Sequence, residues 1–243
     1  MPCVMMPGSI ITPDWLLPDN VGVAITTRAW GNLAAHVGDD PAQVLLRRRR
    51  LHRQLQLPVA INFLTQQHTA TVSKYPKIHR PSDGVYANRI ASCAVLTADC
   101  LPLLICSEDG QQIAAVHAGW RGLAAGILTH AIRQFSAPPE SLRLFIGPAI
   151  CQRCFEVGAD VVNAFSASGK VAADHFTEGA AADDGSPRWL CDLAGLAQQQ
   201  AQLAGINHLQ QSGQCTACSA DLFYSHRKCK DKGRFASIIW RKR

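Results

Sequence analysis

Three short apolar runs in the middle of the chain constrain its fold more than any other feature. They cover residues 94–97, 101–106 and 113–117. Their content of β-branched residues is that of buried strands. Glu108-Asp109-Gly110, between the last two runs, is typical of a hairpin turn. The sequence therefore predicts neighbouring strands in a sheet, with the last two paired as an antiparallel hairpin.

This hairpin places two chemically capable side chains together. Cys100 directly precedes the strand predicted at 101–106, and His117, 17 residues later, ends the strand predicted at 113–117. A thiol beside an imidazole is either a nucleophile with its base or two ligands of a soft metal. The ordinary alternative is that both residues are structural, a buried cysteine and a histidine hydrogen-bonded to the backbone. The nearby polar residues Asp99 and Arg121 argue against this alternative.

The rest of the chain indicates one α/β domain over residues 1–243, because no linker divides it. Residues 1–18 are Pro-rich and expected to be extended. Further strands are predicted at 21–27, 59–64, 142–146 and 234–240. Helices are predicted at 41–55, 119–135 and 193–205, with part of another at 161–165. Residues 73–90 are predicted to form loops and a turn, and 166–188 a mobile surface segment.

Composition excludes several protein classes. The chain is 47% hydrophobic and 17% charged, which is not the balance of a disordered or coiled-coil protein. It has no run of eighteen apolar residues and no signal-peptide pattern, so we expect a cytoplasmic protein that does not enter a membrane. The ten cysteines are then expected to be thiols or metal ligands and not disulfides.

The net charge of +6 raises the question of a nucleic-acid partner. The main basic run, residues 47–50, falls within a predicted helix, where successive side chains point in different directions. It therefore makes no single basic patch, and we expect no nucleic-acid partner. One of these arginines could still contact an anionic substrate.

Several polar motifs recur in a characteristic order along the chain. They are N-L-A-A-H-V-G-D-D-P at 32–41, Q-Q-H-T-A at 66–70, A-D-C at 98–100, V-H-A-G-W-R-G at 116–122, I-G-P-A-I-C-Q-R-C-F-E-V-G at 146–158, C-D-L at 191–193 and F-Y-S-H-R-K-C-K-D-K-G-R at 223–234. In this order and spacing the chain resembles the YfiH-like family, also called the laccase-domain or multicopper polyphenol oxidase family. The resemblance spans roughly residues 20–240.

The resemblance implies a single α/β domain with a mixed β-sheet flanked by helices. It implies a metal site at His68, Cys100 and His117. The implied activity is phosphorolysis of adenosine, inosine, guanosine and methylthioadenosine, with deamination of adenosine. The partners are then a purine nucleoside and phosphate, and the protein a monomer or small homo-oligomer. An older description of the family is copper-dependent polyphenol oxidase. A likeness to a toxin deamidase that uses a Cys-His pair keeps a cysteine hydrolase as an alternative, and a metal-binding accessory protein without turnover is another.

The ligand chemistry favours zinc over a multicopper centre. Two imidazoles and one thiolate leave one position open on a tetrahedral ion, as in catalytic zinc sites. Multicopper oxidases need many histidines in H-x-H pairs, and this chain has nine histidines and no such pair. A single copper ion remains the alternative occupant.

Phosphorolysis also requires a group that holds phosphate, for which arginine is best suited. Arg121, one helical turn past His117, is the candidate in the catalytic set. Arg48 corresponds to the arginine of the family's N-R-x-x-L segment, although the preceding asparagine is an arginine here. Arg227 corresponds to the first arginine of the family's S-Y-R-R, which reads S-H-R-K here.

The remaining substrate-binding candidates are Asn32, His36 and Glu156. Asn32 and His36 belong to the motif at 32–41, where His36 either contacts substrate or caps the loop. Glu156 is either an acid–base residue or the partner of a nearby arginine.

Two C-x-x-C pairs, Cys151/Cys154 and Cys215/Cys218, each have the spacing of half a zinc ribbon. The pairs are separated by 215 − 154 = 61 positions, more than a zinc ribbon allows. We therefore favour buried or unreactive thiols, with a second, structural zinc site as the alternative. The absence of a G-x-G-x-x-G motif after a strand and of a Walker loop argues against dinucleotide or ATP binding.

Overall fold

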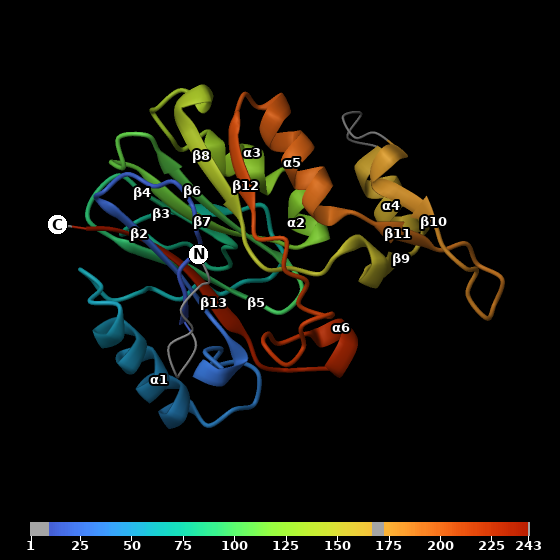
Figure 1. Cartoon of the computed structure of the whole chain (residues 1–243), viewed down its shortest axis with the longest axis horizontal. Helices are drawn as coiled ribbons and strands as arrows, with labels where there is room; N and C mark the ends of the chain where they lie inside the picture. Colours follow the sequence, from blue (N-terminus) through green and yellow to red (C-terminus); the bar gives the residue numbers. More distant parts are fainter. Residues whose placement is uncertain (1–9, 167–172, 243) are drawn as a thin grey trace.

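The structure is a computed structural model that describes residues 10–166 and 173–242. Two β-sheets pack face to face, and helices cover their outer faces (Figure 1). Helix α1 (Pro41–Gln54) covers one sheet, while α3 (Ile127–Ile132) and α5 (Leu193–Leu203) cover the other. The predicted α/β domain with a mixed sheet and flanking helices is confirmed.

The larger sheet has the strand order β12-β8-β6-β7-β4-β3. It is mixed, because β12 runs parallel to β8 and β3 parallel to β4, whereas the other pairs are antiparallel. Its strands are β3 (Val72–Lys74), β4 (Gly84–Ala87), β6 (Leu101–Ser107), β7 (Ile113–Ala118), β8 (Leu142–Ile146) and β12 (His208–Gln211).

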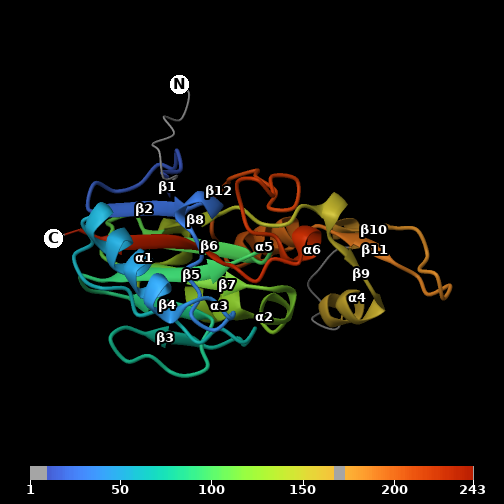
Figure 2. The ribbon, with the colours of Figure 1, turned by 90° about the horizontal axis from the view of Figure 1, so that it is seen from below.

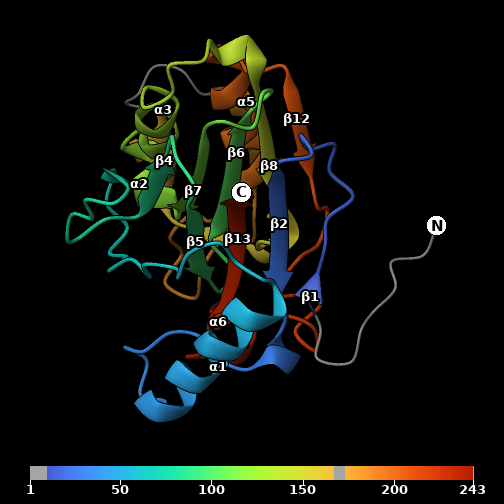
Figure 3. The ribbon, with the colours of Figure 1, turned by 90° about the vertical axis from the view of Figure 1, so that its left-hand side faces the viewer.

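The second sheet is antiparallel throughout, with the order β1-β2-β13-β5. Its strands are β1 (Ile10–Ile11), β2 (Val21–Thr26), β5 (Ser92–Thr97) and β13 (Phe235–Arg241). Figure 3 shows β2, β13 and β5 beside the strands of the larger sheet.

Strict alternation along the strands divides the core into three layers. In β6, Leu103 and Ile105 face α3 and α5, whereas Leu104 faces the second sheet. In β5, Val95 faces the larger sheet and Leu96 faces α1. Both faces of both sheets are therefore buried, which explains why these strands are continuous apolar runs and not alternating ones.

A smaller unit extends to one side of the sheets, with α4 beside it (Figure 2). Its sheet has the order β10-β11-β9. The elements are β9 (Glu156–Val157), α4 (Ala159–Ser166), β10 (Phe176–Glu178) and β11 (Trp189–Cys191). The remaining elements are α2 (Trp120–Ala124), α6 (His226–Cys229) and the 3₁₀ turns Arg28–Trp30, Pro139–Ser141, Gln152–Cys154 and Ala173–His175.

The starts of the helices predicted at 41–55 and 193–205 are confirmed, and each carries a capping hydrogen bond. The Asp40 carboxylate accepts a hydrogen bond from the Ala42 N–H, with Pro41 in the first turn. The Asp192 carboxylate accepts from the Gly195 N–H at the start of α5. None of the helices in the described part of the chain is long and apolar enough to cross a membrane.

The predicted strand at 59–64 is wrong. The segment has no regular structure, and the free edge of β5 is occupied by a side chain in place of a strand. The amide of Gln66 donates to the Leu96 carbonyl at 2.7 Å and accepts from the Leu96 N–H at 2.9 Å. One glutamine side chain thus satisfies both backbone groups of Leu96 at this edge of the sheet.

Three other predictions need correction. The segment 73–90 contains β4 and most of β3, both too short to show periodicity. The single helix at 119–135 is two helices, because Gly126 adopts a left-handed conformation (φ +85°) that breaks the helical backbone. Within 166–188, residues 173–175 form a 3₁₀ turn and β10 pairs with β11, so part of this segment is regular structure. Residues 167–172 and 1–9 lie outside the described chain.

Candidate active site

The β6–β7 hairpin positions the first two functional side chains. Its register pairs Leu101 with Ala118 and Pro102 with His117. Cys100, directly before β6, therefore lies beside His117. The Cys100 Sγ and one imidazole nitrogen each of His117 and His68 lie within 4.8 Å of one another. The predicted set of three is brought together.

His68 comes from a loop that a single buried carboxylate holds in place. Asp83, which is fully buried, accepts hydrogen bonds from the backbone N–H groups of Gln67 (3.1 Å), His68 (3.0 Å) and Thr69 (2.7 Å). It also accepts from the Thr69 hydroxyl at 2.8 Å. These bonds stabilise His68 in a left-handed conformation (φ +59°) that is unfavourable for a residue with a side chain.

The same carboxylate orients His117. Asp83 Oδ1 lies 2.8 Å from His117 Nδ1, and the Asp83 carbonyl accepts from the His117 backbone N–H at 2.7 Å. An ionised carboxylate is only an acceptor, so the Nδ1 proton stays on His117 and Nε2 is directed to the site. Burial opposes ionisation of Asp83, but the hydrogen bonds from His117 and the 67–69 loop outweigh it and lower the pKa to about 2.

Without a metal, the thiol and the imidazole form an ion pair. Burial opposes ionisation of Cys100, but the neighbouring His117 and His68 rings lower the pKa of its thiol to about 6. Burial also opposes protonation of His117, but the Cys100 thiolate and Asp83 raise the pKa of the imidazole to about 9. Cys100 is therefore a thiolate at neutral pH, the state needed by a metal ligand or a nucleophile.

The donor atoms fit a tetrahedral zinc ion. Cys100 Sγ lies 3.7 Å from His68 Nε2. Zinc bonds of about 2.3 Å to sulfur and 2.0–2.1 Å to nitrogen place two such donors about 3.5 Å apart. A carboxylate on the remote nitrogen of a ligand histidine, as Asp83 is on His117, is the usual support of such a ligand.

Gly119 explains part of the motif that follows His117. A Cβ atom at this position would lie 2.5 Å from His68 Cδ2 and 3.1 Å from Cys100 Sγ. Real Cβ atoms do not approach other atoms as closely as the first of these distances. Only glycine therefore allows the three donor side chains to converge here.

The three donors open into a cavity of about 280 Å³ at the end of the sheets where β5 and β7 finish and β6 and β13 begin. This volume is close to the lower limit of about 300 Å³ for small-molecule sites. Its lining residues are His36, Gln66, His68, Leu96, Thr97, Ala98, Cys100, His117, His226 and Arg234.

Four of the nine predicted site residues therefore share one cavity: His36, His68, Cys100 and His117. Asn32 is buried next to it, and its side-chain oxygen accepts from the backbone N–H of Arg234 at 2.9 Å. Asn32 thus positions a residue of the cavity wall.

The three predicted arginines are engaged elsewhere in the structure. The guanidinium of Arg121 lies over the Trp120 ring, at 4.2 Å from its centroid. Arg48 donates twice to the Leu33 carbonyl, at 2.9 and 2.7 Å, and stacks on the ring of Phe63. None of these arginines is among the residues that line the cavity.

Arg227 and Glu156 contact each other through the backbone. Arg227 Nη1 donates to the Glu156 carbonyl at 2.7 Å, and the Glu156 side chain is exposed. The Arg227 backbone N–H donates to Asp99 Oδ2 at 2.7 Å, next to Cys100 in sequence. Arg227 therefore supports the Cys100 turn through its main chain.

Two important residues were missed in the sequence. Asp83 stands in an Asp-Gly pair, which indicates a turn and conceals a buried carboxylate. Arg234 lies directly before β13 and reaches the cavity only because β13 pairs with β5. Its position within the 223–234 motif was the available signal.

The two C-x-x-C pairs come together, contrary to the expectation from their separation in sequence. The sulfurs of Cys151, Cys154, Cys215 and Cys218 all lie within 4.8 Å of one another. The parallel pairing of β8 with β12 brings the loops that follow both strands to the same edge of the sheet. A separation of 61 residues along the chain therefore does not keep the two pairs apart.

A family model described as multi-copper polyphenol oxidoreductase laccase matches residues 20–242. The chain belongs to the laccase-like YfiH family. This YfiH-family protein is 38% identical over 246 residues to a Shigella flexneri protein named purine nucleoside phosphorylase YfiH, covering 96% of this chain and 99% of that one. It is 36% identical to a Haemophilus influenzae protein named purine nucleoside phosphorylase, covering 95% and 98% of the two chains.

Solved structures agree with this assignment. The Neisseria meningitidis protein NMB0706 matches with a TM-score of 0.88 at 36% identity, covering 96% of this chain and 99% of that one. YlmD from Geobacillus stearothermophilus matches with a TM-score of 0.82 at 28% identity, covering 93% of each chain. The family resemblance expected from the motifs is confirmed.

Proposed function

We propose that this YfiH-family protein is a zinc-dependent purine nucleoside phosphorylase that also deaminates adenosine. The observation that carries the proposal is the single cavity in which His68, Cys100 and His117 converge beside Arg234. Full-length similarity to proteins named purine nucleoside phosphorylase supports the substrate class. Adenosine, inosine, guanosine and methylthioadenosine are the proposed nucleosides, used by a cytoplasmic monomer or small homo-oligomer.

Zinc held by His68, Cys100 and His117 would supply Lewis-acid activation of water or of a substrate oxygen at neutral pH. The chain's own contribution is to keep these donors ready. Asp83 holds the proton of His117 on Nδ1, so that Nε2 remains a donor for the ion. The low pKa of Cys100 keeps its sulfur ionised without an external base.

Arg234 is the best-placed phosphate ligand in the cavity wall. Its Nη1 is anchored by the carbonyls of Lys232 (2.8 Å) and Gly233 (2.9 Å), and its backbone N–H by Asn32. In the described part of the chain, its Nε and Nη2 atoms have no hydrogen-bond partner. An anchored guanidinium with one free edge is suited to charge-assisted bonds with phosphate oxygens.

In phosphorolysis, a phosphate oxygen forms a bond to C1′ of the ribose while the bond from C1′ to the purine nitrogen breaks. The bonding pair leaves with the purine, which takes up a proton, and ribose 1-phosphate is the second product. Arg234 would hold the attacking phosphate against the sugar. In deamination, water replaces the 6-amino group of adenosine and ammonia leaves, so this reaction needs no phosphate ligand.

The two reactions provide a test of the assignment. Arg234→Ala should raise KM for phosphate at least about tenfold, since a charge-assisted bond is worth about 1.5–3 kcal/mol. Adenosine deamination by the same variant should change much less. Arg121→Ala is the matched control, because its guanidinium lies on Trp120. Equal effects of the two substitutions on KM for phosphate would contradict the role of Arg234.

A cysteine hydrolase is the second candidate, because Cys100, His117 and Asp83 also have the order of a nucleophile, its base and an orienting acid. His68 separates the two functions, since it is a metal ligand in one and has no role in the other. His68→Ala should abolish activity and make Cys100 more reactive to iodoacetamide. An active His68→Ala enzyme, insensitive to chelator and inactivated by alkylation, would establish the hydrolase instead.

A further inference from the structure

Four of the cysteines that the proposed reaction does not use are gathered by the strand topology. Cys151 and Cys154 follow β8, and Cys215 and Cys218 follow β12. These strands are parallel neighbours, and a further bridge between Ala149 and Cys215 extends their pairing into the loops. Two backbone bonds, from Ala149 N–H to Gln214 (3.2 Å) and from Thr216 N–H back to Ala149 (3.1 Å), hold the loops together.

The sulfur positions match a tetrahedral site. All four lie within 4.8 Å of one another, and Cys154 Sγ lies 3.5 Å from Cys218 Sγ. Four sulfurs at about 2.3 Å from a zinc ion are about 3.8 Å apart. A disulfide needs about 2.05 Å, which the Cys154–Cys218 distance exceeds by far. A small contraction of the cluster would bring every sulfur into bonding range.

Backbone amides already support one of the sulfurs. The N–H groups of Cys151 and Cys218 donate to Cys215 Sγ at 3.3 and 3.4 Å. Such bonds stabilise a thiolate and fix the direction of its lone pairs, which is what a metal ligand requires. They come from both cysteine pairs, so the arrangement belongs to the assembled cluster and not to either motif alone.

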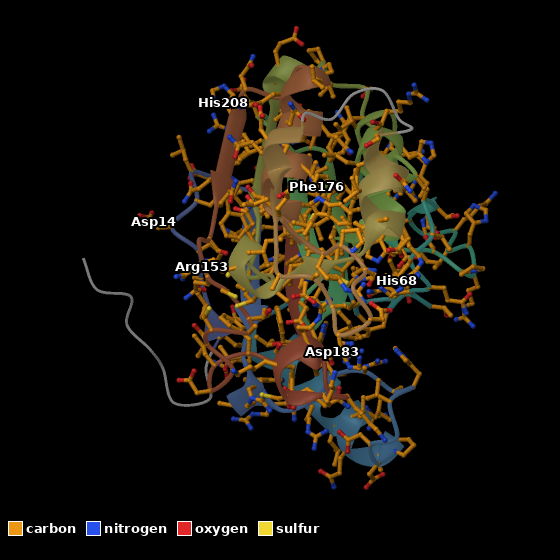
Figure 4. All side chains as sticks on the ribbon, turned by 90° about the vertical axis from the view of Figure 1, so that its right-hand side faces the viewer. Asp14, His68, Arg153, Phe176, Asp183 and His208 are labelled. Carbon is orange, nitrogen blue, oxygen red and sulfur yellow. The ribbon has the colours of Figure 1, made fainter. Side chains whose placement is uncertain are left out.

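We propose that Cys151, Cys154, Cys215 and Cys218 bind a structural zinc ion. Four protein ligands leave no open position, so this site holds two loops together and does not activate water. It shares no ligand with the His68, Cys100 and His117 site. Arg153 lies between Cys151 and Cys154 in the sequence. Figure 4 shows Arg153 and His68 on opposite sides of the view.

The two loops that carry the proposed zinc ligands contact the active site through one buried residue, Asp99. Thr216, between the ligands Cys215 and Cys218 in sequence, donates its hydroxyl to Asp99 Oδ1 at 2.7 Å. The Ile150 N–H, from the other zinc loop, donates to the Asp99 carbonyl at 2.9 Å. Asp99 precedes Cys100 and adopts a left-handed conformation (φ +89°) that needs such support. The structural zinc is therefore a positioning element for the Cys100 turn.

The first test isolates the second site by removing the first. A His68→Ala/Cys100→Ala variant purified under reducing conditions should retain about one zinc ion per chain, measured by elemental analysis. Adding Cys154→Ser and Cys218→Ser should reduce zinc to near zero. Cys229→Ser, an exposed cysteine outside the cluster, is the matched control and should keep the metal. A double-alanine variant without zinc, or equal zinc contents with and without the serines, would overturn the proposal.

Cobalt identifies the ligands directly. With Co²⁺ in place of zinc, the His68→Ala/Cys100→Ala variant should show the strong thiolate-to-metal charge-transfer absorption of a four-sulfur tetrahedral site. This absorption should fall by about a quarter when Cys154→Ser removes one thiolate. An absorption that does not depend on Cys154 would show that the cobalt is bound elsewhere.

A measurement on the unmutated protein covers the case in which the serine variants fail to fold. Cys218 is exposed, and it should react readily with iodoacetamide only after a chelator has removed zinc. Peptide mapping locates the label. Equal labelling of Cys218 with and without chelator would contradict a zinc site. A disulfide among the four cysteines in protein purified under reducing conditions would also contradict it.

Discussion

Asp83 offers the sharpest test of how the site is assembled. Five donors point at its two oxygens: His68 N–H and His117 Nδ1 at Oδ1, and Gln67 N–H, Thr69 N–H and the Thr69 hydroxyl at Oδ2. Asp83→Asn keeps the shape of the side chain but replaces one acceptor with an NH₂ donor. Whichever way the amide turns, its NH₂ group faces donors.

In the less costly orientation, the amide oxygen takes the place of Oδ2, which accepts three hydrogen bonds. Its NH₂ then faces His117, which must move its proton from Nδ1 to Nε2 to accept a hydrogen bond. That tautomer blocks the nitrogen available to the metal. Asp83 therefore controls both the stability of the 67–69 loop and the donor state of His117.

The magnitude follows from the hydrogen bonds and the pKa. The pKa of Asp83 is lowered from 3.8 to about 2, and this difference corresponds to about 2.4 kcal/mol of stability at neutral pH. We expect Asp83→Asn to lower the free energy of unfolding by about 2–4 kcal/mol, the range in which breaking buried charged hydrogen bonds falls. Because the folded-state pKa is depressed, this contribution is present above pH 4 and disappears as pH falls toward 2.

The assay is urea unfolding of the chelator-treated protein at pH 7, with the zinc affinity of the same variant measured separately. We expect the affinity to fall by about 10- to 100-fold, as for the loss of other carboxylates that support metal ligands. Asp109→Asn is the control, since Asp109 also accepts bonds from Ser107 and Gln111 but lies in the β6–β7 turn. An Asp83→Asn protein as stable as wild type, with unchanged zinc affinity, would refute this account.

Three further results are expected. Gly119→Ala should reduce zinc content, measured by elemental analysis, and turnover more than tenfold, because its Cβ would lie 2.5 Å from His68 Cδ2. Gly179→Ala is the control and should change neither, because its Cβ would lie 3.4 Å from the nearest atom. The rate of alkylation of Cys100 in the chelator-treated protein should be half-maximal near pH 6 and lower below that pH, because the thiol has a pKa of about 6. A rate that is half-maximal near pH 9 would contradict the ion pair. The zinc-loaded enzyme should oxidise phenols negligibly in a spectrophotometric assay, since the chain has no H-x-H pair, and robust laccase-like turnover would contradict the assigned site.

The sequence predicts the sheet core and the Cys100–His117 pair for a local reason. β6 and β7 are adjacent in the chain and joined by a short turn, so the apolar runs and the turn residues determine their register. The strand at 59–64 failed because its backbone lies next to no strand, and only tertiary structure shows that Gln66 occupies the edge of β5.

The residues that the sequence concealed act over long separations. Arg234 reaches the cavity through the pairing of β13 with β5, and Cys151 meets Cys215 through the pairing of β8 with β12. Neither pairing follows from local periodicity, because strand order in a sheet is a property of the whole fold. Asp83 was hidden for a different reason, since an Asp-Gly pair has the same local pattern in an exposed turn and at a buried site.

The proposed function requires that the cavity of His68, Cys100 and His117 cleaves purine nucleosides with phosphate. The most direct measurement is product analysis of zinc-loaded enzyme with inosine, with and without phosphate, by chromatography and phosphorus NMR. We predict hypoxanthine and ribose 1-phosphate only when phosphate is present, and loss of both products in His68→Ala. Release of free ribose without phosphate, or full phosphorolysis by His68→Ala, would contradict the account.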